Sequence, residues 1–67
     1  MEDENKIEIC AKLCELLKLT QAGRGIERIW YDEARQCAVI YRGGYTHSVN
    51  VGGDSGIALI KDIIGKV

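Results

Sequence analysis

The chain has 67 residues, of which 46% are hydrophobic and 28% are charged, and this composition predicts one small globular domain over residues 1–67. A chain of this length buries only about 60% of the surface that it exposes when unfolded, so small domains are often stabilised by association with a second chain. The net charge of −1 and the pI of about 5.7 disfavour a dedicated nucleic-acid-binding protein. Such proteins owe most of their affinity to basic side chains that neutralise the phosphate charges of the nucleic acid.

The first element expected along the chain is an amphipathic helix over residues 6–19. Apolar side chains recur at the i, i+3, i+4, i+7 spacing of one helix face, and the charged side chains, Lys6 among them, fall largely on the opposite face. The pattern dissolves before Gly23, a residue type that commonly ends a helix. The apolar stripe consists of Ile7, Cys10, Ala11, Cys14 and Leu17, with Leu13 and Leu16 beside it.

Three strands are expected next, over residues 25–31, 36–42 and 45–51. The first two are rich in β-forming residues and flank the polar turn DEAR. The last two flank Gly43 and Gly44, which accommodate the positive φ angles of a tight hairpin. Short turns between consecutive strands predict an antiparallel meander.

A second helix is expected over residues 55–65, where isoleucines recur at helical spacing. The letters GDSG that precede it also surround the nucleophilic serine of chymotrypsin-like proteases. We interpret Asp54 or Ser55 as the cap of the helix, since a nucleophile needs a base, an orienting carboxylate and an oxyanion hole. The only histidine, His47, is expected to point into the core. The sequence therefore predicts a protein that is not an enzyme.

The element order predicts an α+β fold of two layers, with both helices on one face of a three-stranded antiparallel sheet. Helix–strand–strand–strand–helix in fewer than 70 residues resembles the double-stranded-RNA-binding domain. That family meets RNA through a lysine-rich start to its second helix, where this chain has Asp54, Ser55, Gly56 and Ile57. The resemblance therefore implies the fold and not the function.

Counting outward from the two turns assigns each strand residue to one face of the sheet. The expected pairs include Tyr31 with Gln36 across the first turn and Ile40 with His47 across the second. The face beneath the helices is expected to carry Ile29, Tyr31, Ala38, Ile40, Tyr45, His47, Val49 and Val51. The opposite, open face is unusually apolar for a sheet surface that meets water. Its expected members are Ile26, Arg28, Trp30, Cys37, Val39 and Tyr41, with Thr46, Ser48 and Asn50 beyond.

We interpret this open face as a protein interface, most simply between two copies of the chain related by a two-fold axis, and otherwise with another protein. Its centre would be Ile26, Trp30, Val39 and Tyr41, with Arg28 and Asn50 at the rim. The alternative is a nucleic-acid-binding module in which Trp30 and Tyr41 stack on bases and the arginines contact phosphates.

Cysteine usage and the N-terminal residues indicate a cytoplasmic protein with reduced thiols. The three cysteines, Cys10, Cys14 and Cys37, are an odd number and form no CxxC pair, so neither a disulfide framework nor a zinc site with His47 is expected. The start of the chain lacks the pattern of a signal peptide, and no apolar run approaches the roughly 20 residues that span a bilayer. No cofactor, metal or membrane contact is expected.

Overall fold

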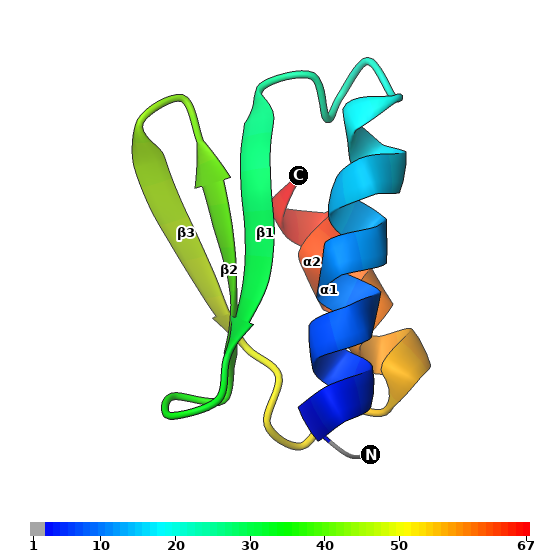
Figure 1. Ribbon diagram of the computed structural model, residues 1–67, viewed down its shortest axis with the longest axis vertical. Coiled ribbons are helices and arrows are strands. Elements are labelled where there is room, and N and C mark those ends of the chain that lie inside the picture. Colours follow the sequence, from blue (N-terminus) through cyan, green and yellow to red (C-terminus); the bar gives the residue numbers. More distant parts are fainter. Residues whose placement is uncertain (1–2) are drawn as a thin grey trace.

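The computed structural model describes residues 3–67, which form two helices and one antiparallel sheet. The strands lie in the order β1-β2-β3, and both helices cover the same face of the sheet (Figure 1). This arrangement confirms the expected α+β fold. The elements are α1 (Asp3–Lys18), β1 (Ile26–Asp32), β2 (Cys37–Arg42), β3 (Tyr45–Asn50) and α2 (Gly56–Lys66).

The end of α1 depends on a glycine and a threonine. The helix is already formed at Asp3, three residues before its expected start, and it ends at Lys18. The Thr20 hydroxyl donates to the Leu17 carbonyl at 2.7 Å and accepts from the Gly23 amide at 3.0 Å. A Cβ atom at Gly23 would collide with the Leu17 carbonyl, so the turn requires glycine there.

The β2–β3 hairpin has the expected register. Gly43 and Gly44 have φ angles of 58° and 84°, and Ile40 pairs with His47 as predicted. The β1–β2 register differs, because Tyr31 pairs with Ala38 and not with Gln36. The pairing moves by two positions, so each side chain keeps its expected face.

Ile26 lies in the core, and its expected place on the open face is wrong. The β1–β2 pairing is irregular between Ile26 and Arg28, where Glu27 is inserted. One inserted residue reverses the alternation of side chains, which turns Ile26 toward the helices. Ile26 is buried there with ten other residues of the core cluster: Cys10, Leu13, Cys14, Ile29, Tyr31, Ala38, Ile40, Val51, Leu59 and Ile63.

The first half of β3 lies outside the core, which corrects the expected burial of two residues. Tyr45 is 73% exposed, and His47 is also exposed, although both lie on the helix side of the sheet. The strand splays away from the two helices toward the hairpin (Figure 1). Contact with the core begins at the other end of the strand, where Val49 packs against the core cluster and the following Val51 belongs to it.

Ser55, one of the two residues predicted as the cap, caps α2. Its backbone is extended, with φ −71° and ψ 172°, and its hydroxyl accepts a hydrogen bond from the Ala58 amide at 3.3 Å. Leu59 and Ile63 then point from α2 into the core. The GDSG stretch thus begins a helix.

Candidate interaction surface

The open face of the sheet presents three rows of side chains, one residue from each strand. In the central row Trp30 lies opposite Val39, which lies opposite Ser48. The Arg28 guanidinium lies over the Trp30 ring, 5.0 Å from the ring centroid, which is the geometry of a cation–π contact. The other rows are Arg28–Tyr41–Thr46 and Asp32–Cys37–Asn50.

Six of the seven residues predicted for the interface share this face: Arg28, Trp30, Cys37, Val39, Tyr41 and Asn50. Val39 is buried beneath its neighbours, Trp30 is half-buried, and Tyr41 is 36% exposed. Asp32, which sequence reasoning did not assign to the surface, lies on the same face beside Cys37. The surface therefore combines an aromatic centre with one positive and one negative side chain along β1.

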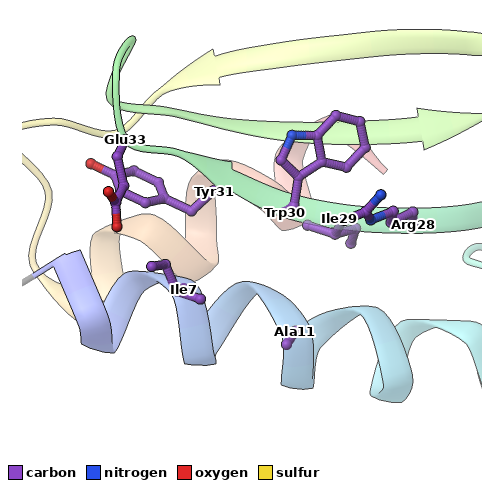
Figure 2. Close-up of a pocket in the computed structure, with 7 residues that line it drawn as sticks. All are labelled: Ile7, Ala11, Arg28, Ile29, Trp30, Tyr31 and Glu33. Atoms are coloured by element: carbon purple, nitrogen blue, oxygen red, sulfur yellow. The ribbon is translucent and has the colours of Figure 1, made fainter.

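A groove of about 410 Å³ runs along the outer edge of β1, between that strand and α1. Figure 2 shows Ile7 and Ala11 on α1, across from residues of β1 and the turn after it. No sequence pattern predicted the groove, because it depends on how far the helix stands from the edge of the sheet. Its lining consists of Ile7, Ala11, Arg28, Ile29, Trp30, Tyr31 and Glu33.

The three thiols are neither joined in disulfides nor grouped into a metal-binding cluster in the part of the chain that the structure describes. All three cysteines are free, and Cys10 and Cys14 are buried. Burial raises the pKa of the Cys10 thiol to about 11, so this thiol stays protonated at neutral pH. Residues 3–67 contain no group of three or more His, Cys, Asp or Glu side chains that could hold a metal ion.

Lys6 is buried, which corrects its expected place on the solvent face of the first helix. Its side chain is 2% exposed, and its ammonium group donates to the carbonyls of Val51 and Gly52 at 2.9 and 3.0 Å. The same ammonium lies 5.7 Å from the centroid of the Tyr31 ring. Lys6 therefore joins α1 to the segment between β3 and α2.

The Asp54 carboxyl interacts with this ammonium group and with the carboxyl of Asp62, its partner in a pair. A hydrogen bond shared with the Asp62 carboxyl, burial and repulsion by Asp62 raise the pKa of Asp54, and the Lys6 ammonium opposes that rise. Oδ2 of Asp54 is buried, and within residues 3–67 no donor reaches it. Asp54 is therefore best satisfied when its carboxyl is protonated and donates a hydrogen bond to Asp62.

Asp62→Asn is expected to increase stability at neutral pH. Because the folded pKa of Asp54 is raised, the folded chain binds this proton more tightly than the unfolded chain. The contribution of the pair to stability is therefore greatest in acid and falls as the pH rises from the ordinary to the raised pKa. Asparagine would remove the repulsion and supply an N–H donor, so this fall should become smaller, with only the effect of burial on Asp54 remaining. The measurement is urea unfolding of both proteins from acid to neutral pH, with the exposed Glu15→Gln as control, and a less stable Asp62→Asn protein at neutral pH would contradict the assignment.

No family model, curated protein or solved structure matches this chain. The topological resemblance to the double-stranded-RNA-binding domain therefore remains a likeness in the order of elements alone. Neither helix that the structure describes is long and apolar enough to cross a membrane.

Proposed function

We propose that this chain is a non-enzymatic interaction module that forms a homodimer through the open face of its sheet. The observation that carries the proposal is the aromatic surface around Trp30 and Tyr41, on the face of the sheet that neither helix covers (Figure 1). Aromatic and arginine side chains are the residue types that most often dominate protein interfaces. A two-fold pairing of this face with itself is the simplest closed assembly.

The alternative, nucleic-acid binding, has less support from the positions of the arginines. Arg42 lies on the helix side, where its guanidinium donates to the carbonyls of Ala22 at 2.8 Å and Val67 at 3.2 Å. Arg28 is thus the one arginine of the three strands that lies on the open face, and it already stacks on Trp30. One positive side chain, with Asp32 on the same strand, offers phosphates little electrostatic attraction.

Reduced thiols support a cytoplasmic location as part of this proposal. Cys10 and Cys14 lie in the core, where they pack as small apolar residues. Cys37 is half-buried on the open face, and its thiol donates to the Arg35 carbonyl at 3.3 Å. An oxidising compartment would favour formation of a disulfide at Cys37, whereas a reducing compartment leaves the Cys37 thiol and the open face unmodified.

Tyr41→Glu is expected to lower the mass of the assembly that the protein forms. Tyr41 lies on the central strand of the open face, and a buried carboxylate without a partner would weaken association by at least about thirtyfold, as at an interface hot spot. Sedimentation measures the mass of the assembly. The matched control is Tyr45→Glu, because Tyr45 lies on the helix side of the neighbouring strand and is exposed. Equal masses for the wild-type protein and both variants would overturn the open-face contact.

A further inference from the structure

The outer edge of β1 is a strand edge that lacks a neighbouring strand within residues 3–67. The Val51 amide donates to the Gln36 carbonyl at 3.0 Å, which fixes the alternation of hydrogen bonds between β2 and β3. Residues of β2 with even numbers therefore direct their backbone groups toward β3, and those with odd numbers toward β1. Val39 pairs with Trp30, so Trp30 directs its backbone groups toward β2 and Ile29 directs its own toward the outer edge.

The groove lies directly beside this edge. Its lining includes Ile29 on the strand, and Ile7 and Ala11 form its wall on α1 (Figure 2). Ile7 is a large apolar side chain that remains exposed there. An added strand would pair with the backbone of β1 and would lie beside this wall, as in β-strand addition.

The two charged side chains that β1 places on the open face, Arg28 and Asp32, are self-complementary. When two copies of β1 run antiparallel around a two-fold axis at Trp30, Arg28 of each copy faces Asp32 of the other. This register agrees with the alternation above, because Trp30 then forms a pair that is not hydrogen-bonded, and such pairs bring side chains closest. The other edge strand, β3, has the sequence YTHSVN, which contains no Asp, Glu, Lys or Arg. Both the groove and the charge pattern thus distinguish β1 from β3.

We propose that the β1 edge is a second self-association site, at which β1 of a second copy pairs antiparallel with β1 and joins the two sheets into one of six strands. This contact is separate from the open-face contact and goes beyond the function proposed above. An isologous edge contact and an isologous face contact would close an assembly of four chains if their two-fold axes intersect at right angles. Charged edge residues would then select the partner and its register instead of only preventing aggregation.

The test uses the Tyr41→Glu protein, in which the open-face contact is removed and the edge contact is kept. Trp30 is unsuitable for this purpose because it lies in both contacts. Arg28→Asp and Asp32→Arg are each added to that protein, and the variants are studied alone and as an equimolar mixture. Each variant alone places two like-charge pairs across the axis, whereas one copy of each restores two opposite-charge pairs.

We expect the Tyr41→Glu protein to sediment as a dimer and each charge variant to associate at least about tenfold more weakly. The mixture should form dimers with one copy of each variant, measured by native mass spectrometry with one variant isotopically labelled. Circular dichroism of each variant separates loss of pairing from loss of folding, since Asp32 also accepts hydrogen bonds from the Ala34 and Arg35 amides.

Three outcomes would overturn the edge contact. A monomeric Tyr41→Glu protein would leave the groove to a strand from a different protein, and the open-face proposal would stand. A dimer whose affinity is unchanged by both charge substitutions would show that the contact lies elsewhere on the protein. Folded variants that fail to recombine in the mixture would exclude this register. If Tyr41→Glu does not change the mass of the wild-type assembly, the open-face proposal fails and the edge is then tested in the wild-type background.

Discussion

Leu59→Ala is expected to destabilise the fold by about 3–5 kcal/mol, the usual cost of a leucine truncation in a well-packed core. Leu59 is 0% exposed and packs in the core cluster. The 11-residue α2 is attached to the sheet mainly through this side chain and Ile63, the only residues of the helix that are buried. A domain of this size has a total stability of about 3–10 kcal/mol, so this loss would remove a large share of it and the variant should unfold at a much lower urea concentration.

Urea unfolding followed by circular dichroism measures this change. The matched control is Ile57→Ala, which removes an aliphatic side chain from the same helix at a site that is 70% exposed. We expect the control to change the free energy of unfolding by less than about 0.5 kcal/mol. Similar losses at both sites would mean that α2 does not pack on the sheet through Leu59.

Lys6→Met is expected to destabilise the fold by about 2–4 kcal/mol. The substitution keeps the apolar stem but removes a charged donor, so two carbonyl groups, on Val51 and Gly52, lose their charge-assisted hydrogen bonds. It also removes the positive charge beside the Asp54–Asp62 pair. The loss should therefore be greater at neutral pH, where Asp54 is ionised more than in acid, because the Lys6 charge favours the ionised form.

Lys12→Met provides the control for this prediction. Lys12 lies on the same helix in an exposed ion pair with Glu8, at 3.2 Å, and such pairs contribute little to stability. We expect a change of less than about 0.5 kcal/mol. Equal effects of the two lysine substitutions in thermal unfolding would show that the Lys6 hydrogen bonds do not hold the β3–α2 segment.

The sequence predicted the elements and the meander because each follows from local pattern and turn chemistry. The β2–β3 register was predictable, because two consecutive glycines favour a two-residue hairpin turn and thereby fix the pairing of the flanking strands. The β1–β2 register was not, because the four-residue turn forms one position later than expected. Asp32 ends β1, its side chain accepts from the Ala34 amide, and Gln36 takes a positive φ of 55°. Because a residue other than glycine adopts this positive φ angle, the sequence does not indicate where the turn forms.

The remaining errors come from tertiary packing. The insertion of Glu27 that buries Ile26 has no glycine or proline to mark it. Lys6 belongs to the charged side chains that are expected on the solvent-facing side of α1. It is buried because its ammonium group binds the carbonyl groups of a loop about 45 residues away in the sequence. Tyr45 and His47 have the alternation of core residues, but the two helices do not extend over their half of β3. Six of the seven residues predicted for an interface nevertheless lie on one face of the sheet, because alternation along β1 and β2 survives a two-residue shift.

Sedimentation of the reduced wild-type protein across a roughly hundredfold range of concentration tests the central claim most directly, because self-association depends on concentration. We predict an assembly of at least two chains that dissociates on dilution and that Tyr41→Glu makes smaller. A monomer at every concentration would contradict self-association, and the surface around Trp30 would then have to bind a different partner.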